Sequence, residues 1–257
     1  MGTKTGKKKA KESKKGYDSS RYPAFAVTVD VVILTVAEGR LEVLLVRRGV
    51  SPFEGLWAIP GGFKRPDETL LQAAERELAS ETGLEDVAAL LQLGSYGDPG
   101  RDPRMNVVTV AHLAVVPAVG RPTAGSDAAA ASLVPVAEAL DGTLELAFDH
   151  RRILADAVER VRADLDLSGL ATAFLEAAFT LAELRAVYEA VWGVRLDAAN
   201  FRRKVVGEPG WVVPTSRRAR PGANGGKPAE LFRAGRNWKL GSPIRRGRHG
   251  AREATNR

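Results

Sequence analysis

A glycine pair followed by a capped, glutamate-rich helix, in residues 60–84, constrains the fold of this chain more than any other stretch. Thr69 with Gln72 three residues later is typical of a capping box, and Gly83 marks a helix end, so one helix of three to four turns is expected between them. An apolar stripe at helical spacing is formed by Leu70, Leu71, Ala74 and Leu78. The helix is therefore expected to pack this stripe against a core.

Two carboxylates of the same segment are placed to work together. Glu77 and Glu81 lie four residues apart, so both are expected on one side of the helix, away from the apolar stripe. Gly61 and Gly62 let the backbone approach a bound group closely. Two carboxylates and a free carbonyl at Gly62 make a partial oxygen cage that Mg²⁺ accepts, with water and phosphates completing it. The segment thus predicts a site for metal and phosphate.

This segment resembles the Nudix box, G-x5-E-x7-R-E-U-x-E-E-x-G-U, of enzymes that hydrolyse nucleoside diphosphates linked to another moiety. The matching residues are Gly62, Glu68, Arg76, Glu77, Leu78, Glu81, Gly83 and Leu84. An ordinary amphipathic helix with solvated glutamates would not explain Gly62 and Glu68 at their offsets. Ser80 departs from the pattern, because it stands where the family has a metal-binding glutamate. We therefore expect Glu77 and Glu81 to be vestigial catalytic residues that still help to recognise a pyrophosphate.

Valine-rich runs on both sides of the box predict a mixed sheet with helices packed on it. A hairpin, a third strand entering the glycine loop and two later strands are expected in residues 24–36, 41–48, 56–62, 88–97 and 107–117. The fold class is α+β, and the resemblance implies a Nudix-type α/β/α sandwich over residues 22–148. Arg47 and Arg48 end the second strand and either reach phosphates or are solvated.

Between the predicted sheet and the end of the chain, the sequence changes to helices. Residues 120–140 indicate a loose loop before a short helix, and a connector helix is expected to start near Asp149 and leave the sandwich. His150 is expected to cap or pack rather than to bind a ligand. Three short helices are expected in residues 170–179, 180–193 and 196–206. Only the four residues 193–196, which include the ends of both ranges, separate the last two, and this is the spacing of a helix-turn-helix.

Two short strands then flank a glycine-rich basic loop, which completes the outline of a winged helix. Base and phosphate contacts are expected from the third helix and the wing, because amide and guanidinium groups match base edges and backbone phosphates. The expected DNA contacts are Thr180, Asn200, Arg202, Arg203, Lys204, Thr215, Arg217, Arg218 and Arg220. The alternative is a small helical oligomerisation domain, which would not need an arginine-rich loop after its most basic helix.

Charge divides the chain in the same way. Lys and Arg outnumber Asp and Glu by 8 to 2 in residues 1–21, are outnumbered 14 to 25 in residues 22–194, and lead by 16 to 4 in residues 195–257. This pattern is typical of a ligand-binding domain joined to one that meets polyanions. Residues 1–21 and 236–257 are expected to be disordered basic tails around a winged helix in 149–235. With no cysteine and no long apolar run, the chain is expected to be cytoplasmic and not to span a membrane.

Together the two halves resemble Nudix-related transcriptional regulators. The resemblance implies a homodimer that represses NAD-metabolism genes by binding double-stranded operator DNA, with ADP-ribose as its effector. Residues implied for effector binding are Arg47, Arg48, Gly61, Gly62, Arg76 and Glu77, and Mg²⁺, if used, would be held at Gly62, Glu77 and Glu81. Two alternatives stay open: a Mg²⁺-dependent Nudix hydrolase acting on ADP-ribose or a related nucleoside diphosphate derivative, and a general nucleic-acid-associated protein.

Overall fold

A computed structural model describes residues 19–83, 87–117, 128–219, 228–241, 243 and 244. Its strands are β1 (Ala26–Ala37), β2 (Arg40–Arg48), β3 (Trp57–Ala58), β4 (Gly61–Phe63), β5 (Ala89–Tyr96), β6 (Val107–Val115), β7 (Ala128–Pro135), β8 (Val212–Arg218) and β9 (Glu230–Ala234). The α-helices are α1 (Leu70–Thr82), α2 (Val136–Asp141), α3 (His150–Leu167), α4 (Leu181–Trp192) and α5 (Ala198–Gly207). Two short 3-10 turns are η1 (Ser19–Arg21) and η2 (Gly169–Phe174). In the described ranges, no helix is long and apolar enough to cross a membrane.

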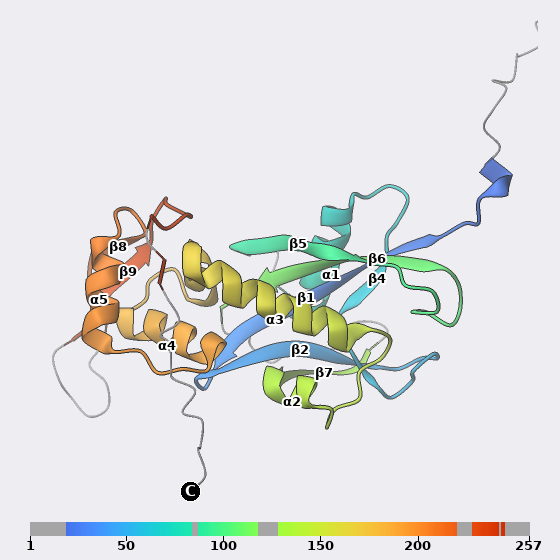
Figure 1. Cartoon of the computed structure of the whole chain (residues 1–257), viewed down its shortest axis with the longest axis horizontal. Helices are drawn as coiled ribbons and strands as arrows, with labels where there is room; N and C mark the ends of the chain where they lie inside the picture. The colour runs from blue at the N-terminus through green and yellow to red at the C-terminus, as the bar shows by residue number, and fades with distance from the viewer. Residues whose placement is uncertain (1–18, 84–86, 118–127, 220–227, 242, 245–257) are drawn as a thin grey trace, which may run out of the picture.

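Seven strands form one mixed sheet in the order β3-β2-β1-β6-β5, with β4 paired to β1 and β7 paired to β2. The central pair β1 and β6 is parallel, from Ala26 opposite Val107 to Leu34 opposite Val115, and the other pairs are antiparallel. Helices cover both faces of the sheet (Figure 1). The expected α/β/α sandwich is therefore confirmed.

The valine-rich sequence of β1 explains why both faces need cover. Val31 and Ile33 point to the face that α1 covers, where Ala74 and Leu78 pack against them. Val32 and Leu34 belong to the core on the other face, which includes residues of α3. Because successive side chains of a strand alternate between faces, a continuous apolar run fits only a strand buried on both sides.

Helix α1 begins and ends where the sequence predicted. The Thr69 hydroxyl accepts from the N–H of Gln72, the Gln72 side chain accepts from the N–H of Thr69, and Gly83 closes the helix with a left-handed φ of 71°. The prediction of the stripe is wrong at one position, because Leu71 is exposed and Ala73 is buried in the core instead. At helical spacing Ala73 and Ala74 share the buried face, which lets the helix approach the sheet closely.

The alanine-rich segment expected as a loop is partly a strand. Residues 128–135 form β7, which pairs antiparallel with β2 from Arg48 opposite Ala128 to Glu42 opposite Pro135. The pairing partner lies 80 to 93 residues earlier in the chain (128 − 48 and 135 − 42), so the preference of the alanines themselves did not reveal it. The short helix expected next is α2, and the connector is α3.

A winged helix lies at the other end of the molecule, with α4, α5, β8 and β9 at the left of Figure 1. Thr180 and Glu183 form the predicted capping box of α4, and Asp197 caps α5. An aromatic cluster around Tyr188 holds these elements together, with ring centroids 4.8 Å from Trp192, 5.5 Å from Phe201 and 6.4 Å from Trp211. The winged-helix prediction is confirmed.

The first of the three predicted helices is wrong. Only η2 forms there, because Phe179 pairs with Phe232 of the wing instead of continuing a helix. Phe179 donates to the Phe232 carbonyl at 2.9 Å, and the return bond measures 2.7 Å. This backbone pairing with β9 replaces the hydrogen bonds that a longer helix would make.

Part of the expected C-terminal tail also packs against the body. We call residues 235–241, 243 and 244 the C-terminal strap. Its Leu240 and Ile244 are buried, and their N–H groups donate to carbonyls at the end of α3, those of Leu167 at 2.9 Å and Asp166 at 3.0 Å. The strap therefore ties the wing to α3. The remaining tail residues up to 18 and from 245, together with Leu84, lie outside the described residues.

Candidate ligand pocket and nucleic-acid interface

A cavity of about 500 Å³ opens beside α1. It is lined by β1, β2, β4 and α1, by the loop around Arg101, and by the residues at the start of α3. Ser80 and Glu81 also line it, so Nudix-box residues face one space. The structure brings together all six residues expected to bind an effector, namely Arg47, Arg48, Gly61, Gly62, Arg76 and Glu77.

Close contacts within the protein favour glycine at both Gly61 and Gly62. A Cβ at Gly62 would overlap the carboxylate of Glu77, and a Cβ at Gly61 would overlap the side chain of Asp30 and the carbonyl of Val29. A larger residue at Gly61 would therefore require a shift of the backbone, whereas one at Gly62 would displace the Glu77 side chain. The close approach expected for a bound group is thus made by the protein itself.

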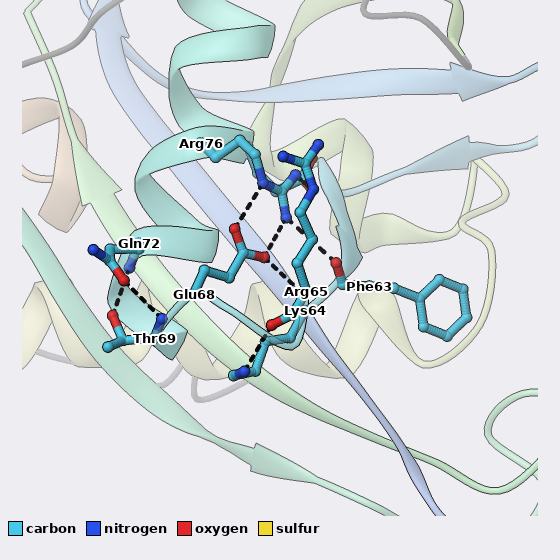
Figure 2. A network of polar contacts seen from close by, with 8 residues as sticks. Phe63, Lys64, Arg65, Glu68, Thr69, Gln72 and Arg76 are labelled. Atoms are coloured by element: carbon cyan, nitrogen blue, oxygen red, sulfur yellow. Dashed lines mark hydrogen bonds and ion pairs between the residues drawn. The ribbon is translucent and has the colours of Figure 1, made fainter.

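Arg76 organises the carboxylates of the box (Figure 2). Its Nη2 and Nε donate to the two Glu68 oxygens at 2.7 and 3.0 Å, and its Nη1 donates to Glu77. Glu68 also accepts from the Arg65 backbone N–H at 2.7 Å. The hydrogen bonds from Arg76 and Arg65 lower the pKa of the Glu68 carboxyl from 4.5 to about 2, while Glu68 raises the pKa of Arg76. Glu68 is thus a charged structural group.

The donor set around Ser80 is incomplete for a magnesium ion. Glu77 is paired with Arg76, Glu68 is held by the same guanidinium, and Ser80 offers a hydroxyl that donates to Glu81 at 3.4 Å. Nowhere in the described ranges do three His, Asp or Glu side chains gather so that they could hold a metal ion. Mg²⁺ is usually held by one or two carboxylates, with waters and phosphates completing its shell. Here one of the two candidate carboxylates, Glu77, is already paired with Arg76, so Gly62, Glu77 and Glu81 do not by themselves fit one.

The floor of the cavity is a charged cluster that the sequence analysis missed. Arg101, with only 5% of its side chain exposed, donates to both Asp149 oxygens at 2.7 and 3.1 Å and lies 3.6 Å from Asp30. Asp149 therefore does not cap α3 with its side chain, contrary to expectation. Asp30 interrupts the apolar run of β1, which was the available signal that this position faces a site.

His150 joins the same floor as a packing residue, as expected. Its Nδ1 accepts from the Ile59 N–H at 2.9 Å, so the proton of the neutral ring is on Nε2, which lies 3.7 Å from Asp30. Burial lowers the pKa of His150, which favours this neutral form. The histidine thus fixes the junction between β3 and β4 on the start of α3.

Aromatic and cationic side chains form another wall, of which only Arg48 was expected from the sequence. Phe148 has a φ of 56°, rare for a bulky residue, and contacts Phe53 edge-on at 4.8 Å between ring centroids. The Arg48 and Arg104 guanidiniums lie 4.9 and 6.0 Å from the Phe148 ring centroid. The cavity therefore has an aromatic side as well as a polar side.

The candidate nucleic-acid surface is the outer side of α5. Asn200, Arg202 and Arg203 are exposed on it. Arg203 donates to the Asn200 amide oxygen at 2.6 Å, and Arg202 lies 3.5 Å from Glu230 of the wing. Lys204 differs from the expectation of a free phosphate contact, because it is partly buried and its ammonium donates to the Pro243 carbonyl of the strap.

Among the expected DNA contacts outside α5, some side chains are exposed and others have structural partners. Arg217 and Arg218 are exposed on β8, and Arg218 reaches the Pro228 carbonyl at 3.3 Å. Thr215 uses its hydroxyl to donate to Leu231 at 2.8 Å, and Thr180 uses its hydroxyl in the α4 cap, so both side chains have structural partners. Arg220 lies outside the part of the chain that the structure describes.

Comparisons with known families agree with this division. The model of the NUDIX domain matches residues 24–157, and the model of the NrtR DNA-binding winged helix domain matches residues 171–234. The "ADPR responsive transcriptional repressor NtrR" of Acinetobacter baylyi is 34% identical over 219 residues, which cover 84% of this chain and 85% of that protein.

Two solved structures are similar as well. Shewanella oneidensis NrtR complexed with a 27mer DNA has a TM-score of 0.73 and 31% identity, and the match covers 85% of this chain and 99% of that one. The NUDIX domain of the same protein complexed with ADP ribose has a TM-score of 0.51 and 35% identity, covering 56% of this chain and 94% of that one.

Proposed function

The chain belongs to the NUDIX family and carries the NrtR winged helix, and from this premise we propose that it is a transcriptional repressor that responds to ADP-ribose. The winged helix binds operator DNA, and the NUDIX domain binds the effector. Both partners are bound by similar proteins, since one was solved with DNA and its NUDIX domain with ADP ribose.

One observation carries the proposal: the ligand cavity and the exposed basic helix belong to one connected structure. His150 at the start of α3 lines the cavity, Asp149 just before it holds Arg101 of the lining, and the far end of α3 bonds to α4. Near that end, the Tyr188 hydroxyl donates to Leu165 at 3.2 Å and the Trp192 indole donates to Arg162 at 3.1 Å. A ligand that moves the floor therefore acts on the support of the winged helix.

We extend the proposal to the residues of each site. Arg47, Arg48, Arg76 and the glycine loop bind the effector, and Asn200, Arg202 and Arg203 of α5 meet the major groove. Their support is their common cavity and their common exposed helix face, respectively. Arg217 and Arg218 of the wing meet the sugar-phosphate backbone, a contact that fixes register without reading sequence.

We also propose a homodimer, because an operator with two half-sites needs two recognition helices. The operators would belong to NAD-metabolism genes, and a protein that binds them works in the cytoplasm. A hydrolase is the second candidate function. It is supported by the retained Glu68, Arg76, Glu77 and Glu81, and it is opposed by Ser80 and by the incomplete donor set.

A mobility-shift titration tests the proposed function. The full chain should retard candidate operator DNA, and saturating ADP-ribose should release it, while AMP at the same concentration serves as a ligand control. A parallel assay of ADP-ribose hydrolysis with Mg²⁺ separates the two candidates. Turnover together with an operator isotherm that ADP-ribose leaves unmoved would establish the hydrolase instead.

A further inference from the structure

Arginines are the most numerous charged residues of the cavity lining. Six of them line it with four carboxylates, those of Asp30, Glu77, Glu81 and Asp102, and two carboxylates just outside the lining, Glu68 and Asp149, pair with Arg76 and Arg101. His150 is neutral, as argued from its hydrogen bond with Ile59. These fixed charges balance, so the diphosphate of a nucleotide sugar has to be bound by guanidinium donors that no carboxylate of the protein occupies.

The side chains of five of the six arginines already have hydrogen-bond partners. Arg47 donates to the Gly55 carbonyl at 2.9 Å, Arg48 donates to the Pro52 carbonyl at 2.8 Å, and Arg104 donates to Asp102 at 2.7 Å. Arg76 and Arg101 are held by carboxylates, as described above. These bonds fix the five guanidiniums and occupy part of their hydrogen-bonding capacity.

Arg65 is the exception. Within the part of the chain that the structure describes, its side chain makes no hydrogen bond or ion pair and is attracted to Glu68 only at longer range. Its backbone is nevertheless anchored on both sides, because its N–H donates to Glu68 at 2.7 Å and its carbonyl accepts from the Lys64 ammonium at 2.8 Å. Figure 2 shows the side chain running from the loop toward the guanidinium of Arg76.

Two neighbouring guanidiniums repel each other unless an anion lies between or beside them. The five N–H donors of an arginine match phosphate oxygens well, and hydrogen bonds between charged groups are the stronger kind. Glu68 already satisfies one edge of Arg76, so Arg65 is the group whose donors remain for a ligand. Ser80 removes the carboxylate that would have helped to hold a cation at the same place.

We propose that Arg65 binds the diphosphate of the nucleotide effector directly, so that protein cations rather than a resident metal ion neutralise it. The inference rests on the proposed function, because it names a residue and a ligand group within the same cavity. It also explains how a box with an incomplete metal donor set keeps affinity for a pyrophosphate. Arg65 was not among the residues singled out from the sequence.

Calorimetric titration of the full chain with ADP-ribose and with adenosine tests this inference. We expect Arg65→Gln to weaken ADP-ribose binding on the order of 10- to 100-fold, the usual effect of losing a hydrogen bond between charged groups. Adenosine has no phosphate, so its affinity should stay within about twofold of the unmodified chain. Arg65→Lys should fall between the two, because it keeps the charge and loses the planar donors.

Arg40→Gln is the matched control, since Arg40 is an arginine with an exposed side chain at the start of β2 and does not line the cavity. It should leave ADP-ribose affinity within about twofold. Chelation by EDTA should likewise leave the affinity of the unmodified chain unchanged. Equal ADP-ribose affinity of Arg65→Gln and the unmodified chain, equal losses for adenosine, or a strict need for Mg²⁺ would each overturn the inference. If the unmodified chain binds no ADP-ribose at all, the proposed function itself fails.

Discussion

Ser80 decides how much chemistry this box retains. It lines the cavity beside Glu77 and Glu81, where the Nudix pattern has a further glutamate. A hydroxyl is a much weaker ligand for Mg²⁺ than a carboxylate, so the protein should hydrolyse ADP-ribose far below the ordinary enzymatic range of about 1 to 1,000 per second. Ser80→Glu should raise Mg²⁺-dependent hydrolysis, measured as release of AMP.

Ser80→Gln is the control for that experiment, because glutamine has nearly the size of glutamate without its charge. It should leave hydrolysis at the level of the unmodified chain. An unmodified chain that turns over faster than about 1 per second would show that the remaining carboxylates suffice.

The bond between Arg76 and Glu68 predicts a dependence of stability on pH. The pKa of Glu68 falls from 4.5 to about 2 on folding, so the folded state favours the charged carboxylate. This contribution is fully present above pH 4.5 and is lost as the pH falls toward about 2. Urea unfolding should therefore show a stability difference between the unmodified chain and Glu68→Gln that is largest above pH 4.5 and shrinks toward pH 2. A difference that stays constant from pH 5 to about pH 2 would contradict this account.

At the level of single residues, the Nudix-box positions could be predicted from the sequence, but the charged cluster around Arg101 at the floor of the cavity could not. Gly61, Gly62, Arg76 and Glu77 could be identified because they are close in the chain and follow a fixed spacing. The floor combines β1, a loop, and the start of α3, and it depends on how the sheet folds them together. No short-range pattern links such residues, and only the isolated Asp30 in an apolar strand hinted at them.

Among the elements, those with local signals were predicted and those fixed by distant pairing were not. The capping boxes of α1 and α4 and the hairpin of β1 and β2 follow from a few neighbouring residues each. In contrast, β7 is a strand because β2 supplies hydrogen bonds, and the helix predicted at residues 170–179 is cut short because Phe179 pairs with the wing. Tertiary pairing outweighed local preference in both cases.

Helix α5 should read base edges through its exposed polar face. Arg203→Ala should weaken operator binding by about 1 to 3 kcal/mol and change binding to random DNA little, because a guanidinium that contacts a base distinguishes sequences. The bond from Arg203 to Asn200 at 2.6 Å orients both side chains before DNA arrives. Fluorescence anisotropy with operator and scrambled duplexes at one salt concentration measures the effect.

Arg160→Ala is a suitable control, since Arg160 is an exposed arginine on α3, outside α5 and the wing. It should leave operator affinity unchanged. Equal losses on operator and scrambled DNA for Arg203→Ala would assign Arg203 to the phosphate backbone and not to a base.

For the whole molecule, the linkage between the two ligands is the decisive property. If ADP-ribose weakens operator binding by a given factor, operator DNA must weaken ADP-ribose binding by the same factor, typically about 5- to 150-fold. Titrations in both directions measure the two factors independently. Arg101→Gln should reduce this factor, because Arg101 holds Asp149 at the start of α3 from within the cavity.

The control here is Arg152→Gln, one turn further along, whose exposed side chain pairs with Asp98 away from the cavity lining. Its coupling factor should match that of the unmodified chain. Unequal factors in the two directions would mean that the titrations report more than one equilibrium. An unchanged factor in Arg101→Gln would move the route of communication away from the floor cluster.

Helix α3 also limits how such a protein can be recombined. The two family matches end at residue 157 and begin at residue 171, and the intervening Val161 and Leu165 are buried in the core that both halves share. A gene fusion that exchanged the DNA-binding half at residue 149 would also remove part of the floor of the effector cavity. A graft at residue 168 would leave the incoming winged helix on a foreign support. Exchange of ligand-binding and DNA-binding domains in this architecture therefore requires that α3 keep its contacts with both of them.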